Sequence, residues 1–299
     1  MERSRLSPSG LVLLALVTLA WGLSWTAIKV VLAELPPLTF RAICLVGGGA
    51  GVLGLARLAG QSLRVPAGAW GRLLAIAAGS VIGWNVFLIY GIAALPSGRA
   101  ALIGYTMPLW STLLSVWLLG ERLTARRAGS LVLGMAGVVV LLAGDLAGMA
   151  SAAGGVVLML AAALSWGFGV VLLKRFALPM PPACLTGWMM LAGSVPFVVG
   201  AVVLEHDRWR PVSASVWLGL TYSVVIAFMF GYWAYNRLVL MVPVAVSSVS
   251  ILATPVVGVL SGMWLLHEPL TWREVVAGAC IVGAIGLVLR SPARGAGER

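Results

Sequence analysis

Ionisable side chains are scarce in this sequence. Asp and Glu together number nine, His two and Cys three, in a chain of 299 residues. The cysteines, Cys44, Cys184 and Cys280, lack the spacing of a metal-binding or redox motif. There is no Gly-x4-Gly-Lys-Ser/Thr sequence and no Ser-His-Asp grouping placed for nucleophilic catalysis. We therefore expect no enzyme activity, no cofactor and no metal site.

Apolar residues take the place of the missing charge. They make up 61% of the chain against 10% charged residues, and the mean hydropathy is +1.05. A soluble protein is about half apolar and about a quarter charged, so lipid has to solvate much of this chain. Runs of about 20 weakly charged residues predict membrane-spanning helices. The segments that fit are 10–32, 37–58, 70–92, 97–118, 127–144, 154–174, 182–204, 213–235, 243–265 and 272–290.

These ten segments define the fold class as an all-α polytopic membrane protein. The apolar runs are continuous rather than alternating, which argues against a β-barrel. In a soluble protein the net charge of +11 would suggest nucleic acid as a partner. Here a cytoplasmic N-terminus puts 14 of the 20 basic residues on the cytoplasmic side, as the positive-inside rule requires. We expect cytoplasmic termini, a bacterial inner-membrane location, and the lipid bilayer rather than nucleic acid as partner.

A duplicated pattern divides the chain into two halves. Trp-Gly-x6-Lys-x6-Pro-Pro occurs at Trp21–Pro37 and again 145 positions later at Trp166–Pro182. Its lysines, Lys29 and Lys174, are the only two in the protein. Gly-Glu-Arg-Leu-Thr from Gly120 matches His-Glu-Pro-Leu-Thr from His267 at an offset of 147. We expect two repeats, 1–147 and 148–299, that together form one membrane domain.

Each repeat holds five expected helices, and five is an odd number. The second repeat therefore has to enter the membrane from the opposite side. Inverted repeats of this kind are typical of secondary transporters, in which the substrate binds at the repeat interface near the bilayer midplane. A duplicated scaffold without transport remains the alternative.

The chain resembles the drug/metabolite transporter superfamily, specifically its ten-helix EamA type. The marks of that type are a Pro-containing fourth helix, Leu-Gly-Glu-Arg-Leu-Thr and a Gly-rich fifth helix. They match Pro108, Leu118–Thr124 and the spacing of Gly129, Gly134 and Gly137. Within the superfamily, the nearest likeness is to YddG-type exporters of aromatic and other amino acids. The resemblance implies a substrate cavity between helices 1, 3, 4, 6, 8 and 9, with helices 5 and 10 peripheral.

Three tryptophans are the strongest candidates for the site. Trp21, Trp84 and Trp166 lie about halfway along their expected helices, where an indole N–H has no partner in lipid. We expect each to face a polar cavity or a neighbouring helix, and core packing is the alternative. Polar side chains that could bind an amino acid beside them are Asn85, Tyr105, Tyr232, Ser247 and Ser248.

Other marked positions have structural explanations. Pro108 and Pro255 lie halfway along expected helices 4 and 9, so we expect both helices to kink there, either as hinges or cavity-lining breaks or as purely structural kinks. Glu121 can pair with Arg122 in a turn between helices. Each lysine is expected to anchor a helix end at a membrane surface, with a gate contact as the alternative.

We expect an exporter of amino acids, aromatic and other neutral ones favoured, that works by alternating access. Ion coupling usually requires a carboxylate or histidine inside the membrane. All nine acids and both histidines lie outside the expected mid-membrane zone, which favours facilitated transport. The alternatives are export of another small metabolite or drug-like compound, or an intramembrane lipid-modifying enzyme. The many glycines are compatible with a monomer or a weak homodimer.

Overall fold

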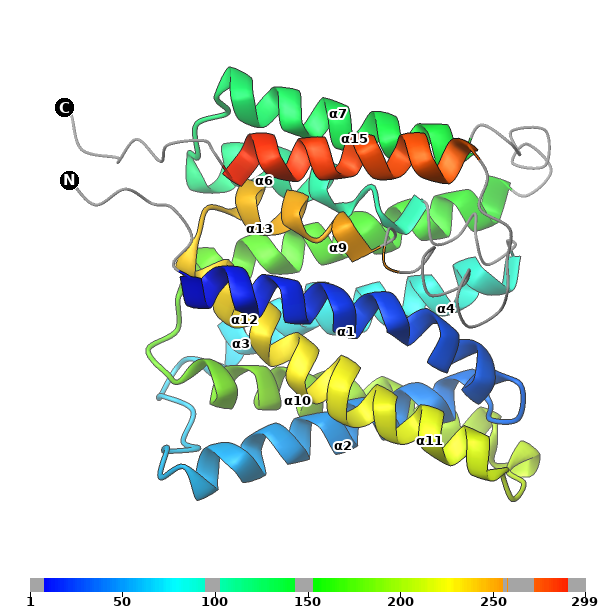
Figure 1. Cartoon of the computed structure of the whole chain (residues 1–299). Helices are drawn as coiled ribbons and strands as arrows, with labels where there is room; N and C mark the ends of the chain where they lie inside the picture. The colour runs from blue at the N-terminus through cyan, green and yellow to red at the C-terminus, as the bar shows by residue number, and fades with distance from the viewer. Residues whose placement is uncertain (1–7, 95–102, 143–152, 255–256, 258–271, 290–299) are drawn as a thin grey trace.

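The computed structural model describes residues 8–94, 103–142, 153–254, 257 and 272–289, and these form helices and short connections (Figure 1). The first half contains α1 (Pro8–Leu32), α2 (Pro37–Leu58), α3 (Trp70–Ala77), η1 (Ala78–Gly83), α4 (Trp84–Ala94), α6 (Met107–Leu119) and α7 (Ala125–Leu142). The second contains α9 (Ala153–Phe176), α10 (Pro182–Leu204), η3 (His206–Arg208), α11 (Ala214–Tyr222), η4 (Ser223–Phe230), α12 (Gly231–Met241), α13 (Val244–Ser250) and α15 (Trp272–Leu289). No strand occurs among these residues, which fits the all-helical prediction.

Among the described residues, five helices are long and apolar enough to cross a membrane. They are Pro37–Leu58, Trp70–Gly91, Ala153–Phe176, Pro182–Leu204 and Ala214–Met241. Shorter apolar helices occur at Ser9–Ser24, Met107–Leu119 and Val275–Ala284. The expected segments 37–58 and 182–204 coincide with α2 and α10. The expected count of ten spans depends in part on stretches outside the described residues.

Within their described residues, the expected helices 97–118 and 243–265 are each interrupted by a turn. A turn at Tyr105 and Thr106 ends the first part of 97–118, and α6 begins at Met107. Pro108 therefore lies in the first turn of α6, where its missing N–H breaks no helical hydrogen bond, and not halfway along a helix as expected. A second turn, at Ile251 and Leu252, interrupts 243–265. Pro255 lies outside the described residues.

Two long helices each contain a π-helical segment at corresponding places. α3, η1 and α4 run on as one helix, and so do α11, η4 and α12. Trp84 and Gly231, the first residues after the two segments, bond through their N–H groups to carbonyls five residues back. π segments inside α-helices are frequent at functional sites. Nothing in the apolar pattern predicts them, because a single shifted turn leaves hydrophobicity unchanged.

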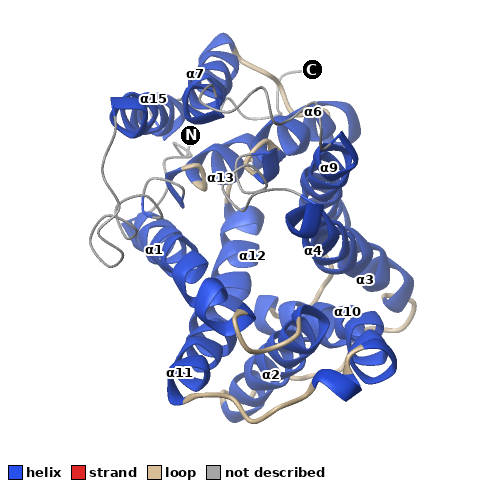
Figure 2. Ribbon diagram, turned by 90° about the vertical axis from the view of Figure 1, so that its right-hand side faces the viewer, coloured by secondary structure: helices blue, strands red, loops and turns tan. Residues whose placement is uncertain are grey.

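The helices form a bundle in which α12 lies among the others and one pair stands at the edge. In Figure 2, α7 and α15 pack on each other away from the remaining helices, as the family resemblance implies for helices 5 and 10. α2 and α10 form another closely packed pair. α1 and α9, the first helices of the two halves, run in opposite directions in Figure 1. α1 begins and α15 finishes at the same end of the bundle.

Two glutamates join helix ends at the opposite end of the bundle. Glu205 accepts hydrogen bonds from the N–H groups of Leu38 and Thr39 and from the Thr39 hydroxyl, and so caps α2, whose own N-cap residue is proline. Glu34 accepts bonds from the hydroxyl and N–H of Ser213 at 2.6 and 2.7 Å, just before α11. These two bonds hold the pKa of the exposed Glu34 carboxyl below its usual range. Glu205 and Glu34 together fix the positions at which α2 and α11 begin.

The π segment η1 packs directly on the backbone of α9. A Cβ at Gly169 would collide with the backbone nitrogen of Ser80, and a Cβ at Gly79 would lie 2.9 Å from the Cα of Gly169. Glycine is required at this crossing because backbone has to touch backbone, as is common between membrane helices.

Gly169→Ala should therefore lower stability by about 1–3 kcal/mol, the usual effect of overpacking. Gly154→Ala is the matched control on the same helix, since a Cβ there meets nothing within 4 Å. Thermal unfolding of the detergent-purified variants measures both. Equal midpoints for the two variants would contradict the tight crossing.

Candidate functional site

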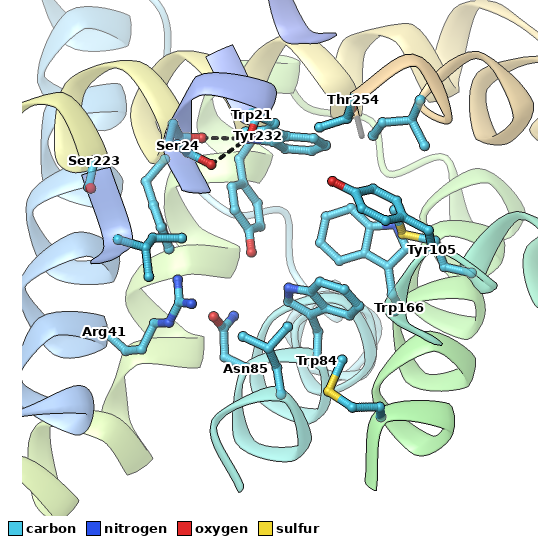
Figure 3. Close-up of a pocket in the computed structure, with 18 residues that line it drawn as sticks. Trp21, Ser24, Arg41, Trp84, Asn85, Tyr105, Trp166, Ser223, Tyr232 and Thr254 are labelled. Carbon is cyan, nitrogen blue, oxygen red and sulfur yellow. Dashed lines mark hydrogen bonds between the residues drawn. The ribbon is translucent and has the colours of Figure 1, made fainter. Parts of the chain in front are cut away.

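A cavity lies between helices of both halves of the chain (Figure 3). Its empty volume is about 830 Å³, including the part open to solvent. α1, α2, α4, α9, η4 and α12 line it, together with the interrupted segments around Tyr105 and Ile251.

Six of the eight residues predicted to bind substrate line this cavity. They are Trp21, Trp84, Asn85, Tyr105, Trp166 and Tyr232. Asn85 and Tyr232 occupy the same place in the two halves, because each is the second residue after its π segment. The interrupted helices and the π segments therefore bring the predicted residues to one place.

The aromatic residues form one connected cluster. The Trp166 ring centroid lies 5.8 Å from that of Trp21, 5.3 Å from that of Trp84 and 5.7 Å from that of Tyr232, all in edge-to-face geometry. Tyr235, which is not among the lining residues, joins the cluster with its ring centroid 5.6 Å from that of Trp166. Contacts of this geometry stabilise each pair by about 0.5–1.5 kcal/mol beyond the area buried. The cluster is therefore a preformed apolar wall.

Trp21 is held by a hydrogen bond across the two halves. Its Nε1–H donates to the carbonyl of Ala227 in η4 at 2.8 Å. The indole reaches this position because residue 231 is glycine, and a Cβ there would collide with the ring nitrogen. The prediction that the indole N–H of Trp21 needs a partner inside the protein is confirmed, and that partner is a backbone carbonyl.

Three buried polar atoms on the cavity wall make no hydrogen bond of normal geometry to the described residues, although the Trp166 indole has a weaker contact with the Tyr235 hydroxyl. They are Asn85 Oδ1, Trp166 Nε1 and Thr254 Oγ1. The amide orientation of Asn85 is fixed, because its Nδ2 donates to the carbonyl of Val81 at 2.8 Å and a carbonyl can only accept. Its Oδ1 is then an acceptor facing the cavity. An unpaired polar atom is costly in an interior of low dielectric constant, so these atoms call for a bound partner.

Ser247 and Ser248, the other two predicted residues, are not among the lining residues. Both side chains are buried in α13. The Ser247 hydroxyl donates to the Val244 carbonyl, and the Ser248 hydroxyl accepts from Ser111 of α6 at 2.7 Å. They join α13 to α6, because a serine one turn into a helix finds backbone and neighbouring hydroxyls before it reaches a cavity.

Arg41 is the main lining residue that the sequence analysis missed. It is the fifth residue of α2, close to a helix end, yet its side chain is only 7% exposed and lines the cavity. Helix 2 was not among the helices expected around the site. Among the described lining residues none is Asp, Glu or His.

At the end of the bundle where α1 begins, Lys174 joins three helix ends. Its Nζ lies 3.1 Å from Glu121 Oε1 and donates to the Val242 carbonyl at 2.6 Å. The same Glu121 oxygen accepts from the N–H of Val244 at 3.1 Å. We call these four residues the Lys174 clasp. The expected partner of Glu121 was Arg122, and the structure pairs it with Lys174 instead. The side chain of Lys29 lies outside the described residues.

Comparisons with known proteins agree with this architecture. The model of the EamA-like transporter family matches the chain twice, at residues 8–143 and 153–290. The uncharacterized transporter YoaV of Bacillus subtilis is 25% identical over 272 residues, which cover 89% of this chain and 91% of that protein. A Salmonella typhimurium protein named "probable amino-acid metabolite efflux pump" is 29% identical over 282 residues, 90% of each chain. One protein of known crystal structure superposes with a TM-score of 0.81 at 25% identity, covering 93% of this chain and 96% of that one.

The chain therefore belongs to the EamA-like transporter family, within the drug/metabolite transporter superfamily. Its relatives are transporters rather than enzymes. Helices of membrane-spanning length and bacterial transporters among the relatives identify it as a multi-pass inner-membrane protein.

Trp21 and Trp166 should differ in how much a Phe substitution lowers stability. Trp21→Phe removes the bond to Ala227, so we expect a loss of about 1 kcal/mol beyond that of Trp166→Phe, whose Nε1–H makes no hydrogen bond of normal geometry and only a weaker contact with the Tyr235 hydroxyl. Thermal unfolding without added substrate compares the two identical substitutions. A larger loss for Trp166→Phe would show that this indole has a partner inside the protein.

Proposed function

We propose that the protein exports amino acids, aromatic and other neutral ones favoured, by alternating access without ion coupling. The observation that carries this proposal is the aromatic-walled cavity with unpaired polar atoms between the two halves of the chain. An aromatic or aliphatic side chain fits the wall of Trp21, Trp84 and Trp166, while the polar atoms bind the charged end of the solute. The name of the Salmonella typhimurium relative favours the same substrate class.

Alternating access rests on the two halves being inverted repeats of five helices, 1–147 and 148–299. Support comes from the two matches of one family model and from the opposite directions of α1 and α9. The interruptions at Tyr105–Thr106 and Ile251–Leu252 support it further, because broken helices at corresponding places are typical of transporter binding sites. Rocking of one half against the other around the cavity would then expose it to each side in turn, with Pro108 next to one of the bending points.

Absence of ion coupling follows from what lines the cavity. A proton or sodium relay needs a carboxylate or imidazole at membrane depth. The lining residues offer Trp, Tyr, Ser, Thr, Asn and one Arg as their polar groups, and none of these releases or takes up a proton near neutral pH as a carboxylate or imidazole would. An uncoupled carrier moves a solute down its gradient, so the cell exports what it accumulates.

Transport of labelled L-phenylalanine into proteoliposomes tests the proposal. We expect counterflow without any imposed proton or sodium gradient, competed by other aromatic and neutral amino acids in a screen of all twenty. Trp166→Ala should reduce the rate about tenfold or more, because it removes the centre of the ring cluster.

Trp217→Ala is the control, because it makes the same chemical change outside the cavity. Trp217 lies on α11 and is 59% exposed. Size-exclusion profiles establish that each variant is folded. Unchanged competition in Trp166→Ala, or transport that needs an ion gradient, would contradict the proposal. If other metabolites compete and no amino acid does, the substrate belongs to another class of small molecule.

The Lys174 clasp joins the two halves of the chain at the end of the bundle where α1 begins. It links α6 of the first half to α9 and to the connection between α12 and α13 of the second half. Arg175 adds a bond to the Leu118 carbonyl at the same end. Opening toward that side has to separate these helix ends, so the clasp is a contact of one state and not of the other.

Glu121→Gln keeps an acceptor for the Val244 N–H but removes the ion pair. Because the pair is partly exposed, we expect hydrogen–deuterium exchange of residues 241–248 to rise about two- to fivefold. Glu34→Gln removes a comparable carboxylate at the other end and should leave this segment unchanged. Exchange equal to that of the unmodified protein would mean that the clasp does not hold the end closed.

A further inference from the structure

Arg41 is a buried cation without an anionic partner in the described part of the chain. Its side chain is 7% exposed, and the guanidinium carbon lies 5.2 Å from the ring centroid of Phe40 and 5.7 Å from that of Phe228. The ion pairs found between described residues are Lys174 with Glu121 and His206 with Asp207. The rings hold the guanidinium in place, but they do not neutralise its charge.

The burial of an arginine without a counter-charge inside a membrane bundle has to be explained by an interaction that offsets its cost. The desolvation of an ion without a counter-charge is strongly unfavourable, and intramembrane ionisable groups that persist usually face a cavity or bind a solute. Arg41 does face the cavity (Figure 3). Position 186, which corresponds to 41 at the repeat offset of 145, is Thr186, and its hydroxyl accepts from Asn236. The charge is therefore no requirement of the shared helix packing, since the other half replaces it with a neutral, paired side chain.

A second unpaired group lies on the same side of the cavity. Figure 3 shows the Arg41 guanidinium, the Asn85 amide and the Tyr232 hydroxyl directed toward the same space, below the ring of Tyr232 and beside Trp84. Asn85 is fully buried, and its Oδ1 is the acceptor left over once Nδ2 has bonded to Val81. The space thus presents a fixed guanidinium and, close by, an oxygen that can only accept.

This combination fits an α-amino acid in its zwitterionic form. A carboxylate matches the planar fork of a guanidinium, which binds it through two parallel N–H bonds. An ammonium is a donor without acceptors and matches the free Asn85 oxygen. The side chain would then extend toward Trp84 and Trp166, across the apolar wall.

We infer that Arg41 binds the carboxylate of the transported amino acid and that Asn85 Oδ1 binds its ammonium group. The inference rests on the proposed function, because it assigns the two ends of that substrate. It also makes a narrower claim, that the protein selects for a carboxylate. Amides, esters and amines with the same side chain should bind more weakly, whatever the fit of the ring.

Binding of L-phenylalanine and L-phenylalaninamide to the purified protein in detergent, by isothermal titration calorimetry, tests this claim. The two ligands share the ring and the amino group and differ in the negative charge. In the unmodified protein we expect phenylalanine to bind about tenfold or more tightly than the amide, the usual effect of a charge-assisted hydrogen-bond pair. In Arg41→Gln this preference should disappear, so that the two ligands bind about equally. Arg41→Lys should keep part of the preference, because the positive charge remains although the planar fork is lost.

Arg237→Gln is the matched control. Arg237 is exposed on α12, where it stacks on Trp233 at 5.6 Å, so the substitution removes the same charge away from the cavity. The ratio of the two affinities is the decisive readout, since a merely destabilised protein would bind both ligands less without changing their ratio.

The outcomes separate the inference from the proposed function. If phenylalanine binds and Arg41→Gln keeps the full preference for it over the amide, Arg41 does not bind the carboxylate and the inference alone fails. A wild-type protein that binds both ligands equally overturns it too. If none of the twenty amino acids binds or is transported, the proposed function fails and the inference falls with it.

Discussion

Lipid offers no hydrogen bonds, and this constraint governs the interior of the bundle. Every polar group at membrane depth has to find its partner inside the protein. Most do so here: Ser24, Ser80 and Ser223 bond carbonyls of their own helices, and the Trp21 indole bonds a carbonyl of η4. Against that background the unpaired groups on the cavity wall stand out. The same constraint that stabilises the helices therefore marks the place where a solute has to complete the hydrogen bonding.

Much of the fold can be predicted from the sequence, because the need to satisfy hydrogen bonds in lipid requires long apolar helices, and these are visible as runs of residues. α2 and α10 coincide with the expected spans, and the expected peripheral position of α7 and α15 agrees with their packing. The tryptophans were identifiable for the same reason, since an indole N–H in mid-membrane needs an explanation at any such position. The rings of Trp21 and Trp166 are in contact with each other; Trp21 also contacts Tyr232, and Trp166 also contacts Trp84.

Other features of the site depend on single turns and side-chain directions, which hydropathy does not encode. The π segments leave the apolar pattern intact, yet they decide that Asn85 and Tyr232 face the cavity. Arg41 lies one turn from a helix end, and only its direction separates a cavity residue from a surface anchor. The converse holds for Ser247 and Ser248, which are absent from the cavity lining because their hydroxyls are bonded within α13 and to α6.

The two halves share a backbone plan but differ in the side chains they bring to the cavity. After the π segments, one half presents Trp84 and Asn85, and the other presents Gly231 and Tyr232. Gly231 makes room for Trp21, so a ring from the first half fills the place that the second half leaves open. The cation occurs in one half and its neutral counterpart in the other. A symmetric scaffold can rock between two equivalent states, whereas an asymmetric lining gives the bound solute one orientation. A zwitterion, with its two charges on one carbon and its side chain pointing away, is a solute for which that orientation matters.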